Sequence, residues 1–233
     1  MSLCKKPQCH NIFALHGFLG LPTDWELFDS ITHPIGVEND GFDLWHWSRS
    51  FNSSVKKTAS KNILIGYSLG GRLAMHSLIS NPDLWDAAII ISANPGLQSV
   101  KEREARLISD EHWAQRFLND PWAPLMHDWN ANAVFGNRPF PYLREESAFD
   151  RKQLSSLLVN WSLGKQESLH ARLKQLSLPI LYLAGEHDKP FCSIADQFRD
   201  FAEVSIIPDA AHRVPWDNPK NFMNKIDIFI GGL

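Results

Sequence analysis

The sequence predicts an α/β fold: a mostly parallel sheet of about six strands, with helices on both faces and a helical insertion. Short apolar segments alternate with helical patterns along most of the 233 residues, which is typical of parallel strands connected by helices. One such strand runs directly into a Gly-x-Ser-x-Gly turn that opens a helix. The alternation stops over residues 97–165, where helical and charged stretches take over. A chain of this length is therefore expected to form one domain with an insertion.

Short segments bounded by turn residues mark the expected strands. They lie near residues 11–16, 41–46, 62–66, 86–92, 179–184 and 203–207. The first begins by about residue 11, which leaves no room for an antiparallel hairpin before it. We therefore expect a sheet of about six strands that lacks such a hairpin. With the insertion at 97–165, the core would comprise residues 1–96 and 166–233.

The turn around Ser68 carries the strongest catalytic signal. Gly66 and Gly70 flank the serine between an apolar strand and a helical pattern. Glycines at these positions allow the sharp, strained turn that lifts a serine hydroxyl clear of a sheet. The following helix directs its N-terminal N–H groups at negative charge that develops beside the serine. This arrangement predicts that Ser68 is a nucleophile.

A serine hydroxyl needs a base, and the base must be oriented by a third group. After this kind of turn, the acid precedes the histidine along the chain. Asp188 follows the strand at 179–184, at the end of the strand where catalytic groups of open α/β sheets lie. Of ten histidines only His212 comes after Asp188, just beyond the strand at 203–207. Singly, a loop Asp or His is more often solvated or structural, but their order and placement predict a triad with Ser68.

Two main-chain N–H groups are the expected oxyanion hole. One belongs to Leu69, directly after the serine, and the other to the loop after the first strand. In that loop Phe18 follows His16 and Gly17, which makes its N–H the candidate. Position alone suggests this pair, because a main-chain donor leaves no side-chain signature. His16 is expected to brace the loop rather than to react.

Five motifs carry a resemblance to known proteins: Leu15-His-Gly-Phe-Leu-Gly20, Gly66-Tyr-Ser-Leu-Gly-Gly-Arg72, Asn94-Pro-Gly-Leu97, Trp113-Ala-Gln-Arg-Phe117 and Gly185-Glu-His-Asp188. With them the chain resembles the α/β-hydrolase superfamily over nearly its whole length. It is similar in particular to the branch of 2-succinyl-6-hydroxy-2,4-cyclohexadiene-1-carboxylate (SHCHC) synthase, which acts in menaquinone biosynthesis. The third and fourth motifs are the more specific, since general esterases do not need them. The resemblance implies an α/β-hydrolase fold in which residues 97–165 form a lid.

Arg72 lies four residues after Ser68, one helical turn below it on nearly the same face. That position alone leaves two interpretations even: binding of a substrate carboxylate, or an ion pair on the helix surface. The resemblance favours substrate binding and implies the same role for Arg106, which by pattern belongs to a charged helix. Tyr67 is a further substrate-binding candidate, as is Trp129, which lies where the branch lines its pocket with an aromatic side chain.

Two departures from the branch bear on the substrate. The branch carries a further lid arginine, and counting in register from Arg151 puts Leu158 at that position. Arg138, Arg144 and Arg151 are the candidates to replace it. After the second expected strand, relatives continue Asp-x-x-Gly-x-Gly, whereas this chain has Asp43-Leu-Trp-His-Trp-Ser48.

The composition narrows the partners and the location. A formal net charge of −3 gives no support for a nucleic-acid or anionic-membrane surface. The longest apolar runs are too short to span a bilayer. Three cysteines, an odd number, predict reduced thiols and a cytoplasmic protein. We expect a monomer or small homo-oligomer that needs no metal or cofactor and binds a small carboxylate-bearing molecule.

Three functions remain open at this point. The leading hypothesis is elimination of pyruvate, as in SHCHC synthase, with the triad acting as a base and Arg72 and Arg106 holding carboxylates. The second is carboxylester or thioester hydrolysis by the same triad. The third is a non-catalytic ligand receptor, which the intact triad disfavours without excluding it, because a fold does not fix a function.

Overall fold

The computed structural model of the chain describes residues 10–38, 41–138 and 140–233. Its strands are β1 (His10–Leu15), β2 (His33–Ile35), β3 (Lys61–Tyr67), β4 (Ala87–Ile91), β5 (Ile180–Gly185) and β6 (Glu203–Ile207). They form a six-stranded sheet in the order β2-β1-β3-β4-β5-β6, in which each pair of neighbours is parallel. The predicted sheet is therefore confirmed. The expectation about a preceding hairpin concerns residues before 10, which lie outside the described ranges.

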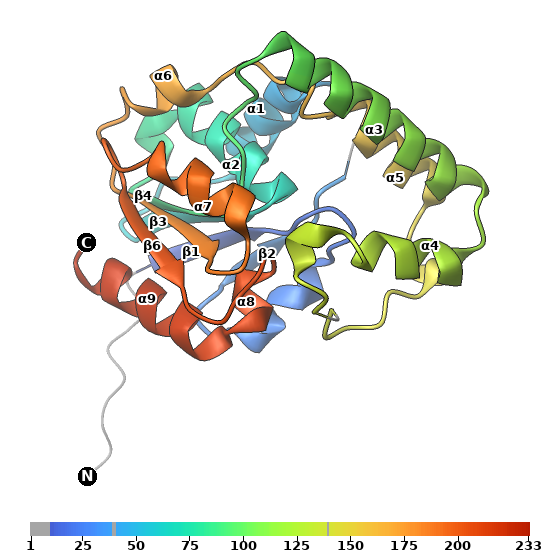
Figure 1. The fold of residues 1–233 in the computed structure, drawn as a ribbon. Coiled ribbons are helices and arrows are strands. Elements are labelled where there is room, and N and C mark those ends of the chain that lie inside the picture. The colour runs from blue at the N-terminus through green and yellow to red at the C-terminus, as the bar shows by residue number, and fades with distance from the viewer. Residues whose placement is uncertain (1–9, 39–40, 139) are drawn as a thin grey trace.

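Helices cover both faces of this sheet (Figure 1). The α-helices are α1 (Leu44–Ser54), α2 (Leu69–Ser80), α3 (Val100–Asn119), α4 (Trp122–Asn130), α5 (Arg151–Asn160), α6 (His170–Leu173), α7 (Lys189–Asp196), α8 (Val214–Asp217) and α9 (Pro219–Gly231). Short 3-10 helices are η1 (Pro22–Leu27), η2 (Pro82–Leu84), η3 (Ala133–Phe135) and η4 (Glu146–Ala148). Side chains of α1, α2 and α7 pack in one hydrophobic cluster, and those of α8 and α9 pack in a second.

The central strand β3 shows how the sheet separates these two clusters. Leu64 packs in the cluster with α1 and α2, whereas Ile63, Ile65 and Tyr67 pack in the cluster with α8 and α9. Successive side chains of a strand point to opposite faces, so a strand covered by helices on both faces is apolar throughout. The next strand, β4, is likewise fully buried. The strands that position the site residues therefore lie in a buried sheet from which water is excluded.

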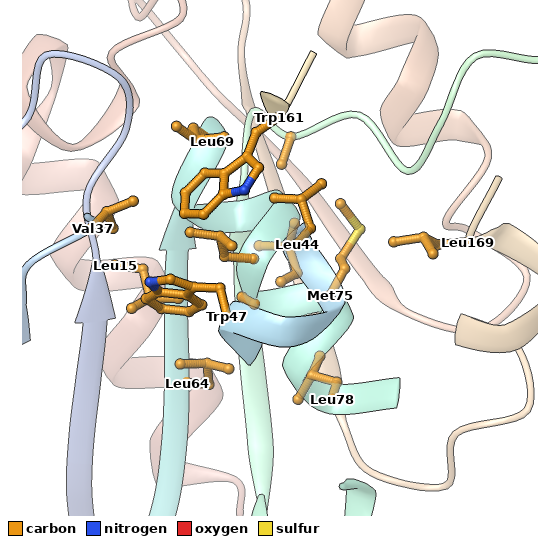
Figure 2. Packing of buried hydrophobic residues seen from close by; sticks show 14 of the residues in the cluster. Leu15, Val37, Leu44, Trp47, Leu64, Leu69, Met75, Leu78, Trp161 and Leu169 are labelled. Atoms are coloured by element: carbon orange, nitrogen blue, oxygen red, sulfur yellow. The ribbon is translucent and has the colours of Figure 1, made fainter. Parts of the chain in front are cut away.

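The expected strand at 41–46 is wrong. The chain forms β2 earlier, at residues 33–35, and α1 begins at Leu44, because the Asp43 carboxylate accepts a hydrogen bond from the His46 N–H (2.7 Å) and caps the helix. Figure 2 shows Leu44 and Trp47 among the buried side chains of the first cluster. The buried residues of α1 are Leu44, Trp47, Ser48, Phe51 and Asn52, a helical spacing that the aromatic residues concealed.

Residues between β4 and β5 form α3, α4 and α5, and α3 lies alongside α5 (Figure 1). The helix α3 begins with a capping box: the Ser99 hydroxyl accepts from the Glu102 N–H, and the Glu102 carboxylate accepts from the Ser99 N–H. We call residues 97–165 the insertion. Among the helices of the described ranges, none is long and apolar enough to cross a membrane.

Candidate active site

Ser68 lies at the junction of β3 and α2 with φ 54° and ψ −112°, a conformation that non-glycine residues rarely adopt. Two neighbouring glycines let the backbone pack closely enough to hold this turn. A Cβ on Gly66 would lie 2.5 Å from the Gly70 carbonyl oxygen, and one on Gly70 would lie 2.3 Å from that of Leu15. The glycines that flank the serine therefore serve close packing, and the strained turn raises Ser68 at the carboxyl edge of the sheet.

His212 and Asp188 converge on Ser68 from two other strand ends. The His212 Nε2 atom lies 3.1 Å from Ser68 Oγ, and His212 Nδ1 lies 2.7 Å from Asp188 Oδ2. Asp188 is fully buried and His212 is nearly so. With Nδ1–H donating to the carboxylate, Nε2 is left to accept the serine proton. The structure thus brings together the three residues that the sequence predicted.

The loop after β1 faces the serine and is fixed by His16. The His16 Nδ1–H donates to the Gly17 carbonyl oxygen (2.8 Å), and Nε2 accepts from the Val37 N–H (3.0 Å). Burial lowers the pKa of His16, which keeps the ring neutral in this role. A Cβ on Gly17 would lie 2.8 Å from the Tyr67 ring, so the loop approaches the serine turn closely. His16 braces the loop, as expected.

The two candidate oxyanion donors line the same cavity as Ser68. Within the described residues, neither the Phe18 N–H nor the Leu69 N–H donates to another protein group. Both donors are therefore available for an oxygen atom beside the serine. Their role in catalysis stays a prediction.

The cavity has a volume of about 300 Å³, which suits a small metabolite. The candidate substrate-binding residues Tyr67, Arg72, Arg106 and Trp129 all line it. The Trp129 ring packs 5.0 Å from that of Phe18 and 4.9 Å from that of Trp113, measured between ring centroids. Burial raises the pKa of Tyr67, so its hydroxyl stays protonated beside the serine. One wall of the cavity is thus aromatic and comes largely from the insertion.

Arg72 is a buried guanidinium that has no carboxylate hydrogen-bond partner among the residues the structure describes. Its Nε–H donates to the Gln166 side-chain oxygen (2.6 Å), and the Gln166 amide nitrogen donates to the Asn94 carbonyl oxygen (3.2 Å). Across the described part of the chain, its Nη2 atom has no hydrogen-bond partner. Burial, followed by the charge of Arg106, lowers the pKa of Arg72 to about 9, and the charge of Asp110 opposes this shift only in part. A bound anion would remove this imbalance.

Arg106 lines the cavity from α3 and is less buried than Arg72. Its Nε–H donates to Asp110 Oδ1 (2.7 Å), and the Ser162 hydroxyl donates to Asp110 Oδ2 (2.7 Å). The side chain of Arg106 is 42% exposed, whereas that of Asp110 is 5% exposed. Arg106 can therefore offer its remaining N–H groups to a ligand, although Asp110 already balances part of its charge.

Leu158 faces the cavity, where the resembled branch has an arginine. Of the three candidates to replace it, only Arg144 is among the lining residues. Arg138 pairs with Asp209 at the surface, and Arg151 donates to Glu146 and to main-chain oxygens. The Arg144 guanidinium forms a two-pronged bridge to Asp24, with Nη1–Oδ1 at 2.9 Å and Nη2–Oδ2 at 2.6 Å.

Sequence reasoning missed two further residues of the site, Gln166 and Arg213. Gln166 comes just after the insertion and orients Arg72 from 94 positions away. Arg213 directly follows His212 and lines the cavity, although it is only 5% exposed. Arg213 could have been found from the sequence, because it is a cation directly after the predicted base His212. No residue near Gln166 in the sequence indicated that it would contact Arg72.

Comparison with known proteins shows the family to which the chain belongs. Residues 12–225 match the alpha/beta hydrolase family. The chain is 34% identical to the 2-succinyl-6-hydroxy-2,4-cyclohexadiene-1-carboxylate synthase of Serratia proteamaculans, covering 93% of this chain and 91% of that protein. It is 29% identical to the enzyme of the same name from Pectobacterium atrosepticum, covering 94% and 93%. The solved structure of MenH from S. aureus superimposes with a TM-score of 0.86 at 19% identity, covering 98% of this chain and 96% of that one.

Proposed function

The chain belongs to the α/β-hydrolase family and, within it, to the branch of the SHCHC synthases, and from that premise we propose that it eliminates pyruvate from a succinyl cyclohexene carboxylate. Such a reaction would place the protein in the cytoplasm, in menaquinone biosynthesis. The proposal rests on the cavity beside Ser68, on the cations that line it, and on relatives that bear this name.

In the proposed mechanism, Ser68 and His212 act together as a base. A proton leaves the carbon next to the substrate ketone and passes through the serine hydroxyl to His212, whose charge Asp188 balances. The electron pair of the broken C–H bond forms an enolate, whose oxygen accepts hydrogen bonds from the Phe18 and Leu69 N–H groups. Collapse of the enolate breaks the C–O bond to the enolpyruvyl group, whose oxygen keeps the bonding pair, and the enolpyruvate that leaves takes up a proton on carbon to become pyruvate. No covalent intermediate with the serine is needed.

The observation that carries the proposal is the buried guanidinium of Arg72, which has no carboxylate hydrogen-bond partner among the described residues. A buried guanidinium costs free energy unless an anion balances it, and the Gln166 amide is neutral. The Nη2 atom lacks a partner in the described ranges, and Arg72 follows Ser68 by one turn of α2. We assign this atom to a substrate carboxylate, with Arg106 as a second contact from the insertion. A carboxylate held there would lie beside the base.

We also propose that the insertion is a lid. Its aromatic side chains, Trp113 and Trp129 among them, line the cavity opposite the sheet. A lid of this kind would exclude water, which strengthens each charge interaction beneath it and protects the enolate from stray protons. Residues 1–96 and 166–233 would then form the supporting core.

Hydrolysis of esters or thioesters is the second candidate, because the same Ser68–His212 hydrogen bond serves an acyl-enzyme mechanism. The two reactions differ in what the serine becomes. Hydrolysis gives a burst of the first product before steady turnover, and elimination gives none.

The test is to supply the purified protein with the pathway substrate and to follow pyruvate with a coupled assay, beside aryl esters of short acyl chains. We expect pyruvate release, weak ester cleavage without a burst, and a fall of about a thousandfold or more in turnover for Ser68→Ala. Rapid burst hydrolysis of the esters with no release of pyruvate would replace the elimination with the esterase.

A further inference from the structure

The loop that carries His212 is attached to the insertion by its main chain. The His212 N–H donates to the Val134 carbonyl oxygen (3.1 Å), and the ring of Phe135 lies 5.8 Å from that of His212. Behind this contact, a Cβ on Gly136 would lie 3.2 Å from the Ala211 Cβ. The histidine that serves the serine is therefore packed against residues that come from between β4 and β5, not from the sheet alone.

Arg213 extends this attachment from the next position in the chain. Its Nη1 donates to the Arg138 carbonyl oxygen (3.2 Å), and its Nη2 donates to the Asn130 side-chain oxygen. The guanidinium carbon lies 3.8 Å from the centre of the Phe135 ring and 4.8 Å from that of Phe140. Both hydrogen-bond acceptors are uncharged, and all of these groups belong to one short part of the insertion, residues 130–138 and 140, which we call the 130–140 segment.

These contacts suit a planar, forked cation and no other side chain. A guanidinium can stack on aromatic rings while its separate N–H groups reach two acceptors, whereas an ammonium cannot do both. Arg213 is buried, and burial lowers its pKa. Burial of its charge costs free energy, which the contacts with its neighbours must offset. Such a cost is expected at positions that serve the function rather than stability alone.

We propose that Arg213 is a positioning residue that fixes the ring of His212 by fastening its loop to the 130–140 segment. Arg213 and His212 are adjacent in the chain, so a main-chain shift that follows loss of the guanidinium contacts would displace the imidazole relative to Ser68 Oγ. A displacement of about 1 Å in a catalytic group can lower a rate about a hundredfold. The insertion would thus complete the base as well as cover the cavity. This inference rests on the proposed role of His212.

The experiment measures how fast a serine-directed fluorophosphonate labels Ser68. In that reaction the serine oxygen bonds to phosphorus, fluoride leaves, and His212 takes the serine proton, so the rate reports the Ser68–His212 geometry without any natural substrate. The variants are Arg213→Gln, Arg213→Lys and Asn130→Ala. The matched control is Arg138→Gln, because Arg138 contacts Arg213 only through its main chain and its side chain pairs with exposed Asp209.

We expect Arg213→Gln to lower the labelling rate about tenfold or more, with Arg213→Lys recovering part of the loss and Asn130→Ala losing less. The control Arg138→Gln should stay within about twofold of the parent, since exposed ion pairs contribute little. Melting curves show whether each variant is folded. If Arg213→Gln does not fold, the labelling rate of Asn130→Ala tests the proposal in its place. Unchanged labelling in the folded variants, or an equal loss in Arg138→Gln, would overturn the proposal.

A second readout separates positioning from substrate binding, because Arg213 also lines the cavity. In pyruvate release, Arg213→Gln should lower kcat and leave KM nearly unchanged. A raised KM with unchanged kcat and unchanged labelling would make Arg213 an anion-binding residue and contradict the inference. If the parent protein releases no pyruvate, the proposed function fails, and the labelling series still tests Arg213.

Discussion

Arg72 and Arg144 line the same cavity, and their charges are balanced in opposite ways. Arg72, on α2, donates to the neutral amide of Gln166 and, in the described part of the chain, leaves Nη2 without a partner. Arg144, in the insertion, is matched atom for atom by the Asp24 carboxylate. Both arginines are buried to a similar degree, since their exposure is below about a tenth.

This difference teaches which cation is available to a ligand. Arg144 and Asp24 form a closed pair that ties the insertion to the loop after β1, so a substrate carboxylate that approached the remaining N–H groups of Arg144 would meet a charge that Asp24 already balances. Arg72 has no carboxylate hydrogen-bond partner among the described residues, and a substrate carboxylate would balance a charge that Asp110 offsets only in part. Position in the cavity therefore does not decide which arginine binds; the partner does. Each prediction below alters one of these balances.

The largest expected effect comes from breaking the closed pair. Replacement of Arg144 by Met leaves Asp24 buried without its partner, so the free energy of unfolding should fall by about 3–5 kcal/mol in a urea titration. The double variant Asp24→Asn with Arg144→Met should recover most of that loss, because no charge is left unpaired. A single variant that keeps its stability but loses activity would show that Arg144 serves the substrate.

The opposite change is expected at Arg72. Arg72→Met should lower kcat/KM about 100-fold, which corresponds to about 2.7 kcal/mol of transition-state binding. Its free energy of unfolding should stay the same or rise, since an unbalanced buried charge has been replaced by an apolar side chain. Steady-state kinetics and a urea titration on the same preparation check both halves. Loss of stability without loss of activity would make Arg72 structural.

His76 sharpens the comparison because it lies one turn beyond Arg72, and its ring nitrogen Nδ1 is 2.7 Å from the Arg72 carbonyl oxygen. Burial is the main cause that lowers its pKa from 6.5 to about 4. Between these values the unfolded chain binds a proton that the folded protein does not, so stability falls as the pH falls through this window. His76→Gln should remove about 2 kcal/mol of that loss at pH 5 and change little at pH 8.

The measurement for His76 is the free energy of unfolding as a function of pH for the parent and His76→Gln. Part of the acid sensitivity should remain in the variant, because burial also lowers the pKa of His16. Parallel curves for the two proteins between pH 4 and 6.5 would mean that the pKa of His76 is not lowered, and they would contradict a neutral His76 ring beside Arg72.

The smallest effect is expected at Arg106, whose charge Asp110 already balances in part. Arg106→Gln should lower kcat/KM about tenfold, less than Arg72→Met. Its free energy of unfolding should fall by less than that of Arg144→Met, because the Ser162 hydroxyl still donates to the buried Asp110 carboxylate after the half-exposed arginine is removed. A loss equal to that of Arg72→Met would mean that the two arginines hold the substrate equally, and the charge balance would not rank them.

The sequence predicted the parts of the site that local pattern encodes. Ser68 stands in a turn whose glycines and flanking elements are read over a dozen residues, and Asp188 and His212 follow apolar strands that are easy to recognise. The prediction of a strand at 41–46 was wrong for a local reason as well, since the aromatic residues of α1 are typical of strands. Its Asp43 cap and helical spacing carried the correct answer.

The charge balance of the cavity could not be predicted, because it depends on partners that are distant in the chain. Gln166 lies 94 positions from Arg72, and Asp24 lies 120 positions from Arg144. The sequence named Arg138, Arg144 and Arg151 as equal substitutes for the arginine that Leu158 replaces. Only the folded chain shows that one of them reaches the cavity and that its charge is already matched.

The most direct test of this account is a crystal structure of the protein with a bound, carboxylate-bearing analogue of the substrate. We predict a carboxylate oxygen about 2.9 Å from Arg72 Nη2, with the bridge between Arg144 and Asp24 intact. An analogue whose carboxylate binds Arg144, with Asp24 displaced and Arg72 still held only by Gln166, would contradict the account.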